Sequence, residues 1–365
     1  MSRRAAKSTD DLPPDSDALE GARHPRETNA LFGHEAAERE FLEAFRQGRM
    51  PQAWLIGGAE GIGKATFAWR AARFVLAHPD PRLPAVVRAT NLATSGEEPA
   101  VRRVIARAHP DVACLRREWD PKSKKHYTEI RVDDVRKALA MFHHAAGEGG
   151  WRIAVIDSAD DLNLAGANAL LKMIEEPPPR SLFFILAHRP ARVLPTIRSR
   201  CRRLTLHPLA PDAIAAAIRA QGEDWADQND EEVLKAAERA SGSVRDAMRL
   251  IGQGALSMVG RVEAELNRLP EVDLKRVRAL ADAAHGREGL EAFETLMTSV
   301  FDWIDRMVRA RAAEPNAAQR LAPLAQVWEK IAASARETRA LNLDRRPLVL
   351  AIFTDLSEAV RASRR

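Results

Sequence analysis

The sequence has little cysteine, with only Cys114 and Cys201 among its 365 residues. Two cysteines exclude a disulfide framework and a four-cysteine zinc site. The histidine pair His143 and His144 lacks the spacing of metal ligands, so the sequence predicts no metal site. No apolar run is long enough to cross a bilayer, and the charged N-terminus lacks the apolar core of a signal peptide. We therefore expect a cytoplasmic location without a membrane partner.

The rest of the composition is ordinary for a soluble globular protein, with 45% hydrophobic and 29% charged residues. A length of 365 residues predicts two or three domains rather than one. The net charge is +5 and the pI about 9.4, and arginine supplies most of the positive charge. Contact with a polyanion and arginine-rich codon usage both explain this balance, and composition does not separate them.

The stretch from Trp151 to Arg203 organises the chain, because it holds two apolar strands separated by a helix. The first strand ends at Asp157. The helix ends at residues 175–178, where two prolines forbid its continuation, and the second strand follows at 181–187. Ligands of open α/β sheets bind beyond the carboxyl ends of the strands. Asp157 is therefore a candidate partner for a phosphate or a metal-bound water.

A further strand at 52–56 leads into a glycine-rich turn and then into an amphipathic helix. The turn residues that predict a phosphate site are Gly58, Gly61, Gly63, Lys64 and Thr66. Glycines let backbone N–H groups converge on phosphate oxygens, the helix N-terminus favours the anion, and the lysine reaches the outer phosphates.

The match to a complete phosphate cradle is imperfect at one position. The full pattern requires serine or threonine directly after the lysine to bind Mg²⁺, and here that residue is Ala65. Thr66 is one residue later, about 100° further around the helix. Two interpretations stay open: a phosphate site, and a tight strand-to-helix turn that serves packing alone.

The pattern predicts three structured parts and a tail. Residues 1–24 are polar and without periodicity, so we expect a disordered tail. An α/β domain follows at 25–208, in which 78–120 reads as an irregular insertion because of its prolines and small residues. Beyond it, apolar residues recur only at helical spacing, which predicts a small helical domain at 209–258 and a second helical domain at 259–365.

Several motifs in a fixed order point to a known family. They are Gly61-Ile62-Gly63-Lys64, Val155-Ile156-Asp157, Asn168 to Lys172, Glu175 to Pro178, Ser199-Arg200-Cys201, and Gly242-Ser243-Val244-Arg245-Asp246-Ala247. Together they resemble the clamp-loader branch of the AAA+ proteins over about residues 27–255, and more weakly beyond. The resemblance implies an AAA+ P-loop-type parallel sheet followed by a helical lid and a helical collar. The nucleotide site that it implies consists of Gly58, Gly61, Gly63, Lys64, Thr66, Asp157 and Arg245.

In this family the Ser-Arg-Cys motif carries an arginine finger. A guanidinium beside a γ-phosphate stabilises the charge of the transition state and contributes about 10³ to 10⁵ in rate. Since such a finger acts on the neighbouring subunit, the resemblance assigns Arg200 to a site shared with an adjacent ATPase. A solvated arginine at a strand edge is the structural alternative. For Arg198, Arg202 and Arg203 we expect surface or interface contacts.

The sequence departs from the active ATPases of the family. Those carry a glutamate after the strand-end aspartate to orient water, whereas Ser158 follows here. Asp160 remains as a possible Mg²⁺ ligand or as a cap of the next helix. His188 stands where the family has a γ-phosphate-sensing threonine, and the zinc module is missing. With Ala65 and Ser158 both unsuitable, we expect ATP or ADP to be bound at most without hydrolysis, and no zinc.

The resemblance leaves two roles in the DNA polymerase III holoenzyme. One is an ATPase motor of the gamma or tau type, and the other is a stator that keeps the fold and the finger but has no hydrolytic activity of its own. The residues favour the stator. Its implied partners are the gamma or tau and delta subunits, the sliding clamp and primed DNA, in a loader that places the clamp on that DNA.

A third function class stays open, namely a nucleic-acid-binding module without a loader role. It rests on the pI and on the basic loop at 121–127, for which a solvated hairpin tip is the favoured interpretation.

Overall fold

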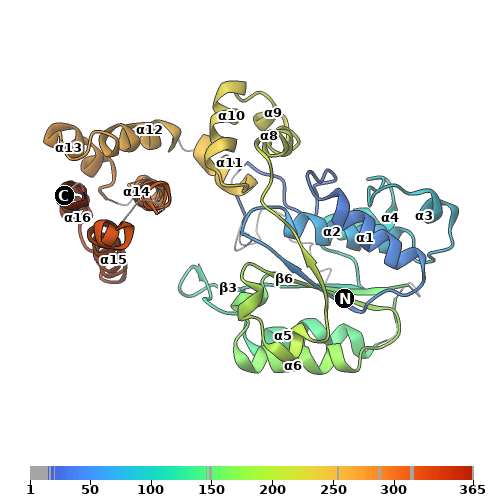
Figure 1. Cartoon of the computed structure of the whole chain (residues 1–365). Coiled ribbons are helices and arrows are strands. Elements are labelled where there is room, and N and C mark those ends of the chain that lie inside the picture. Colours follow the sequence, from blue (N-terminus) through green and yellow to red (C-terminus); the bar gives the residue numbers. More distant parts are fainter. Residues whose placement is uncertain are drawn as a thin grey trace. The chain divides into compact units, whose positions relative to one another are not determined.

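The computed structural model describes residues 15, 18–19, 21–144, 146–147, 150–252, 255–286, 289–312 and 316–363. The chain divides into two compact units, Met1–Met248 and Arg249–Arg365, each of which is described by itself (Figure 1). Of the tail predicted at 1–24, residues 1–14, 16–17 and 20 lie outside the described residues. The domain boundaries at 24, 208 and 258 stay predictions.

A five-stranded parallel sheet forms the centre of the first unit. Its strands, in spatial order, are β2 (Val112–Leu115), β5 (Arg152–Ile156), β6 (Ser181–Ala187), β1 (Ala53–Gly57) and β7 (Arg202–Thr205). Every neighbouring pair is parallel. β1, β5 and β6 are buried along their whole length, as their unbroken apolar sequences predict. The predicted fold class is confirmed.

Alternate residues of the central strands enter two separate cores, because successive side chains of a strand point to opposite faces. Trp54, Val155 and Phe184 belong to one core. Leu55 and Phe183 belong to the other. The first face is covered by α1 (Glu35–Arg46), α2 (Lys64–Ala77), α3 (Pro84–Arg88) and α4 (Pro99–Ile105), and the second by α5 (Val132–Leu139) and α6 (Leu164–Glu175) (Figure 1).

The interpretation of residues 78–120 as an irregular insertion is wrong. This segment contains α3, α4, the edge strand β2 and the short strand β3 (Trp119–Asp120). Its helices have five and seven residues, each beginning with proline at the first position, and are too short to show a periodic pattern. β3 pairs with β4 (Lys125–His126), so the basic loop is an exposed hairpin tip, while its contact with nucleic acid stays a prediction.

Helices make up the rest of the first unit. They are α7 (Pro195–Arg198), α8 (Pro211–Arg219), α9 (Glu223–Ala226), α10 (Asp230–Arg239) and α11 (Val244–Gly252), which extends past the boundary of the unit, with 3-10 turns at Ala140–His143, Ala159–Asp161 and Pro190–Arg192. α10 begins at Asn229, whose side chain accepts hydrogen bonds from two backbone N–H groups of the first turn. α8 and α10 bury Ile214, Ile218 and Val233 on their inner faces.

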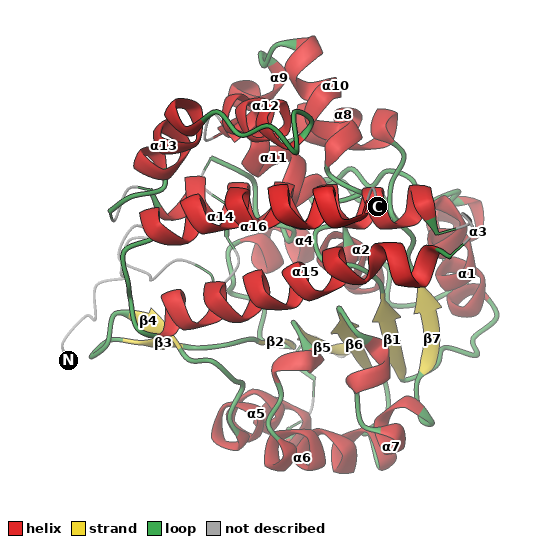
Figure 2. Cartoon of the chain, turned by 60° about the vertical axis from the view of Figure 1, so that its left-hand side comes forward, coloured by secondary structure: helices red, strands yellow, loops and turns green. Residues whose placement is uncertain are grey.

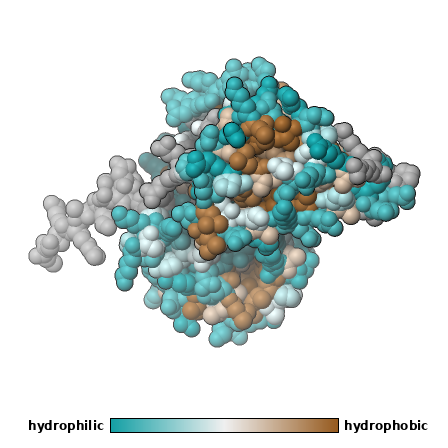
Figure 3. All heavy atoms as spheres, turned by 90° about the vertical axis from the view of Figure 1, so that its left-hand side faces the viewer, coloured by the Kyte–Doolittle hydropathy of each residue, from teal (hydrophilic) through white to brown (hydrophobic). Residues whose placement is uncertain are grey.

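The described part of the second unit is helical, as predicted. Its helices are α12 (Ala255–Leu266), α13 (Leu274–Ala283), α14 (Leu290–Arg311), α15 (Ala317–Ala340) and α16 (Arg346–Ser363), of which α14 and α15 are long (Figure 2). Phe293, Trp303 and Phe353 lie in its core. A space-filling view shows hydrophobic patches between hydrophilic residues on the visible face (Figure 3). Among the residues described, no helix combines the length and apolarity that a bilayer span requires.

Replacing Phe183 by alanine should lower the free energy of unfolding of the first unit by about 3–5 kcal/mol. The ring is fully buried in β6 and stacks on Phe142 with centroids 4.8 Å apart. Hydrogen exchange of the β6 amides measures this change in the first unit alone. The control is Leu164→Ala, at a side chain that is 66% exposed, which should change stability by less than about 0.5 kcal/mol. Equal protection in both variants would contradict the assigned core.

Candidate functional site

The glycine-rich turn between β1 and α2 has the backbone geometry that only glycine tolerates well. Gly58, Gly61 and Gly63 have φ values of 151°, 75° and 104°. A Cβ at Gly58 would lie 2.6 Å from the carbonyl oxygen of Leu206, and one at Gly61 would overlap the hydroxyl of Ser243. These glycines therefore allow a tight turn and a close approach of the segment that begins α11.

Lys64 is directed back onto its own turn. Its ammonium is 2.9 Å from the carbonyl oxygen of Gly58 and also donates to that of Ala59, and the residue is only 4% exposed. Burial lowers the pKa of Lys64 to about 8, against the opposing effect of the nearby carboxylates of Asp157 and Glu60. In this structure the ammonium group, which the sequence predicts to contact phosphate oxygens, donates its hydrogen bonds to carbonyl oxygens of the loop.

The N-terminal end of α11 closes over the same turn. The backbone N–H of Val244 donates to the carbonyl oxygen of Gly61 at 3.0 Å, and Arg245 forms an ion pair with Glu60 at 3.4 Å. The structure therefore brings Arg245 to the glycine turn, as the family resemblance implies. Glu60 had no assigned role in the sequence.

His34 supports the turn from the other side, and the sequence carried no signal for it. Its Nε2 lies 2.7 Å from the carbonyl oxygen of Ile62, although 28 residues separate the two. Burial lowers the pKa of His34, so the imidazole is neutral near pH 7. Thr66 lies half-buried on α2, one residue beyond Ala65.

The carboxyl end of β5 carries Asp157 close enough to Lys64 to interact electrostatically. The next residue, Ser158, is buried, and its hydroxyl has no hydrogen-bond partner within the described part of the chain. It contributes neither charge nor a strong base, so the site lacks the carboxylate that orients water in the active relatives.

Asp160 makes backbone contacts that the sequence did not predict, and its role as a Mg²⁺ ligand stays a prediction. Its carboxylate accepts hydrogen bonds from the backbone N–H groups of His188, at 2.6 Å, and of Arg189, at 3.0 Å. It therefore fixes the turn after β6, and it caps no helix that follows it in the chain. Burial, and then the positive charge of Lys64, lower the pKa of His188 at this turn. The described residues contain no group of three or more side chains placed to hold a metal.

Arg200 lies in the turn between α7 and β7, and its side chain is 42% exposed. One guanidinium nitrogen is 2.7 Å from Oε1 of Glu175, at the C-terminal end of α6, and another donates to the carbonyl oxygen of Thr196 at 3.0 Å. The Glu175 contact was missed, because the sequence gives no sign that α6 and the arginine turn meet. Arg202 pairs with Glu40 at 2.7 Å, which confirms the surface contact expected for it.

The register of the sheet separates Arg200 from the glycine turn of its own chain. β1 and β7 run parallel, with Arg202 opposite Trp54 and Thr205 opposite Gly57. The glycine turn follows the carboxyl end of β1, whereas Arg200 precedes the amino end of β7. Figure 2 shows α7 below the tails of the arrows for β1 and β7. The strand from Trp54 to Gly58 alone spans about 13 Å, so Arg200 does not reach the turn.

Comparison with known proteins gives one family model, described as "DNA polymerase III, delta subunit", which matches residues 33–210. A DNA polymerase III subunit delta' of Pseudomonas aeruginosa is 33% identical over 217 residues, which cover 60% of this chain and 61% of that protein. The Escherichia coli subunit delta' is 31% identical over 170 residues, covering 47% and 46%. A subunit gamma of Buchnera aphidicola is 28% identical over 230 residues, covering 62% and 58%.

The chain thus spans between about half and three-fifths of the length of these curated relatives. Among solved structures, a gamma subunit-related protein of Thermotoga maritima has 16% identity and a TM-score of 0.37, covering 87% of this chain and 99% of that one. The RuvB Holliday junction branch migration motor of the same organism has 18% identity and a TM-score of 0.41, covering 78% and 81%.

The buried ammonium of Lys64 makes the stability of the first unit depend on pH. Since its folded pKa, about 8, is below the ordinary 10.5, the unfolded chain binds more protons between these values, and stability rises with pH across this window. The wild type should gain up to about 3 kcal/mol relative to Lys64→Met between these pH values. Urea unfolding followed by circular dichroism measures the difference. Lys172→Met removes an exposed lysine of α6 but keeps Lys64, so its stability should rise with pH as that of the wild type does. A Lys64→Met profile parallel to the other two would refute the prediction.

Proposed function

The chain belongs to the clamp-loader family of DNA polymerase III subunits, and from this premise we propose that it is the delta-prime subunit, the stator of the loader. In this role it is largely inactive as an ATPase and supplies Arg200 to the site of a neighbouring ATPase subunit while the sliding clamp is loaded on primed DNA. Relatives of both the delta-prime and the gamma/tau kind match the chain. The choice between these roles therefore rests on the chemistry of the site.

The observation that carries the proposal is the separation of Arg200 from the chain's own glycine turn. The two lie beyond opposite ends of β1 and β7, which pair in parallel register. A guanidinium that serves a γ-phosphate must approach it within hydrogen-bond distance. Arg200 therefore serves a phosphate held by another chain, and its exposed position suits such a contact.

The ion pair with Glu175 does not prevent this role. Both side chains are about two-fifths exposed, and pairs of this kind contribute about 0–1 kcal/mol in water. A phosphate oxygen of a neighbouring site replaces the carboxylate at low cost, because both accept the same guanidinium donors. Until then Glu175 of α6 and the Thr196 carbonyl of α7 hold the guanidinium.

The glycine turn supports binding chemistry at most. Ala65 provides no hydroxyl for Mg²⁺, Ser158 provides no carboxylate for water, and Asp160 is engaged by backbone N–H groups. Two separate requirements of hydrolysis are thereby unmet. For Gly58, Gly61, Gly63, Lys64, Thr66, Asp157 and Arg245 we propose ATP or ADP binding without hydrolysis.

A gamma/tau-like motor that hydrolyses ATP is the second candidate. It is favoured by the retained geometry of the turn, with Lys64 near Asp157 and with Arg245 at the loop. It relies on Asp157 and on Asp160, whose two oxygens each already accept one backbone N–H group. The stator role needs no catalytic contribution from Asp160.

The second unit supplies the surface for assembly in this proposal. Trp328 is 46% exposed and lies on Phe301 with ring centroids 5.7 Å apart, and Leu341 is 63% exposed. Exposed apolar residues of this kind are typical of protein contacts. We assign the unit to the collar that joins this chain to the gamma or tau and delta subunits in the cytoplasm, with the sliding clamp and primed DNA as further partners.

Arg200→Ala should lower the clamp- and DNA-stimulated ATPase turnover of the reconstituted loader about 10³-fold or more, because the neighbouring site loses its transition-state cation. Gel filtration must show that the variant still assembles. Arg202→Ala is the matched control, because Arg202 lies two residues away and pairs with Glu40. Full turnover by an assembled Arg200→Ala loader would reduce Arg200 to an interface residue.

The chain by itself should show no magnesium-dependent ATP turnover, and Lys64→Ala should leave the turnover of the assembled loader unchanged. A phosphate-release assay on the purified chain, with and without Mg²⁺, tests the first statement. Turnover by the wild type that Lys64→Ala abolishes would instead establish the motor function.

A further inference from the structure

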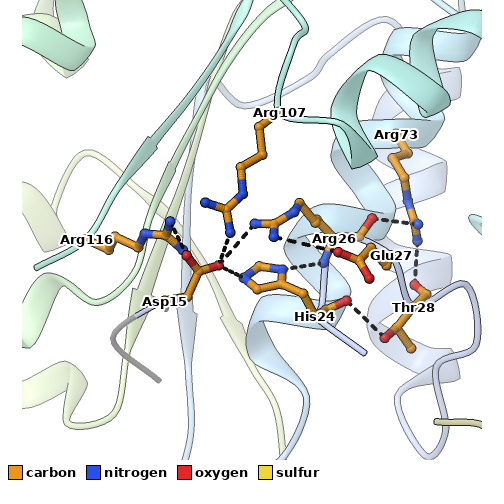
Figure 4. Close-up of polar contacts among 8 residues, drawn as sticks. All are labelled: Asp15, His24, Arg26, Glu27, Thr28, Arg73, Arg107 and Arg116. Atoms are coloured by element: carbon orange, nitrogen blue, oxygen red, sulfur yellow. Dashed lines mark hydrogen bonds and ion pairs between the residues drawn. The ribbon is translucent and has the colours of Figure 1, made fainter. Parts of the chain in front are cut away.

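Four basic side chains surround one carboxylate near the start of the described chain (Figure 4). Oδ2 of Asp15 is 2.8 Å from Nε2 of His24, 3.2 Å from Nη1 of Arg26 and 2.6 Å from Nη2 of Arg107. Arg116 forms an ion pair with the other carboxylate oxygen. The Asp15 side chain is only 2% exposed. These donors come from three separate segments of the chain and meet at a single acidic group.

The cationic wall is held in place by bonds that do not involve Asp15. Arg73, fully buried on α2, donates to the backbone carbonyl oxygens of Arg26, at 2.9 Å, and of Thr28. The Thr28 hydroxyl in turn donates to the carbonyl oxygen of His24 at 3.2 Å. The segment that carries His24 and Arg26 is therefore positioned by α2 and by its own backbone, as a binding site requires.

The hydrogen bonds also determine the state of His24. Its Nδ1 accepts the backbone N–H of Arg26 at 3.1 Å, so the neutral ring carries its proton on Nε2, which faces Asp15. Burial lowers the pKa of His24 and favours this neutral form near pH 7. His24 therefore acts as a donor toward whatever anion lies at the position of Asp15.

The guanidinium of Arg26 is not fully satisfied by Asp15. Its side chain is 9% exposed, and its Nε has no hydrogen-bond partner in the residues that the structure describes. Its second contact is a longer ion pair with Glu27, at 3.6 Å. A planar carboxylate has two oxygens, whereas three guanidinium groups and an imidazole present their N–H donors here. Four basic side chains therefore converge on one acidic group, and among the described residues Nε of Arg26 has no acceptor there.

We propose that His24, Arg26, Arg107 and Arg116 form a binding site for a phosphate group, and that the carboxylate of Asp15 occupies this site in the isolated chain. A tetrahedral phosphate offers more acceptor oxygens and a higher charge than a carboxylate. Arginine forks match its geometry in pairs of parallel hydrogen bonds. The site is distinct from the glycine turn and from Arg200, and its test requires no loader.

The position in the fold agrees with ligand binding. Arg116 directly follows the carboxyl end of β2, and Arg107 follows α4 just before that strand. Ligands of open α/β sheets bind at the carboxyl edge, where Arg116 lies, and Arg107 reaches the same carboxylate from the segment before β2. Because Asp15 is tethered to the same chain, it competes with an external phosphate at an effective concentration of the order of millimolar. Phosphate and Asp15 exclude one another, so the wild type binds phosphate weakly.

Removing the charge of Asp15 should leave the site available to an external phosphate. By isothermal titration calorimetry with inorganic phosphate, at an ionic strength matched with sodium chloride, Asp15→Asn should bind at least about 10-fold more tightly than the wild type. Adding Arg116→Gln should abolish this gain. Asp80→Asn is the control for general charge effects, because Asp80 forms an exposed pair with Arg82. A folded Asp15→Asn chain without a phosphate-specific gain would overturn the proposal.

A second measurement uses the wild type and does not depend on the folding of a variant. Phosphate that displaces Asp15 releases the segment that carries it, so hydrogen exchange of the Ala18 amide, which donates to the backbone carbonyl of Asp15 at 3.1 Å, should accelerate with increasing inorganic phosphate. The backbone at 24–28 should keep its protection, because Arg73 and Thr28 hold it without Asp15. Sodium chloride at equal ionic strength should have no such effect. Identical exchange in the two salts would show that the Asp15 contacts are purely structural, which also overturns the proposal.

Competition in the Asp15→Asn chain then identifies the source of the phosphate. A mononucleotide and an unphosphorylated single-stranded oligonucleotide are each titrated against bound inorganic phosphate. Displacement by the mononucleotide assigns the site to a terminal phosphate, and displacement by the oligonucleotide assigns it to a nucleic-acid backbone. Either displacement supports the site. Neither the mononucleotide nor the oligonucleotide should bind there once Arg116→Gln is added.

Discussion

The parallel pairing of β1 with β7 is the constraint on which the functional arrangement depends. All strands of the sheet point the same way, so every loop that follows a strand lies at one edge and every segment that precedes a strand lies at the other. The glycine turn and Asp157 belong to the first group, and Arg200 belongs to the second. No change of side-chain rotamer alters this separation. Under the proposed function, the glycine turn at one edge and Arg200 at the other are halves of nucleotide sites that neighbouring chains complete.

The glycine turn has structural reasons for its residues that do not depend on a bound phosphate. Its glycines are required by the close contacts with Leu206 and with the start of α11, whether or not nucleotide binds. The carbonyls of Gly58 and Ala59 satisfy Lys64, which is why burial of its ammonium is tolerated. The packing interpretation that the sequence left open is thus supported by these contacts, and the phosphate interpretation stays a prediction that the same backbone geometry allows.

Three acidic side chains in the first unit differ in the groups that stabilise their charge. The pair of Arg70 and Glu38 joins α1 to α2 at 2.6 Å, and one carboxylate matches one guanidinium. The carboxylate of Asp160 accepts hydrogen bonds from two backbone N–H groups. At Asp15, by contrast, one carboxylate faces three guanidinium groups. Burial alone would raise the pKa of Asp15, but hydrogen bonds from His24 and Arg116 hold it well below its ordinary value. This imbalance distinguishes the Asp15 cluster from a simple structural ion pair.

The sequence by itself determined the elements whose signal is local. The apolar runs of β1, β5 and β6, the prolines that end α6, and the helical spacing of the second unit all predicted the observed structure, because strand and helix periodicities are visible within ten to twenty residues. Only the tertiary structure decided the edge strands β2 and β7 and the short helices of residues 78–120, which are too brief to show a period. It also decided the partners of charged residues: Glu175 for Arg200, the N–H groups after β6 for Asp160, and Arg107 and Arg116 for Asp15. Such contacts join residues 25 to 101 positions apart, and an ion pair leaves no periodic pattern in the sequence that brings it together.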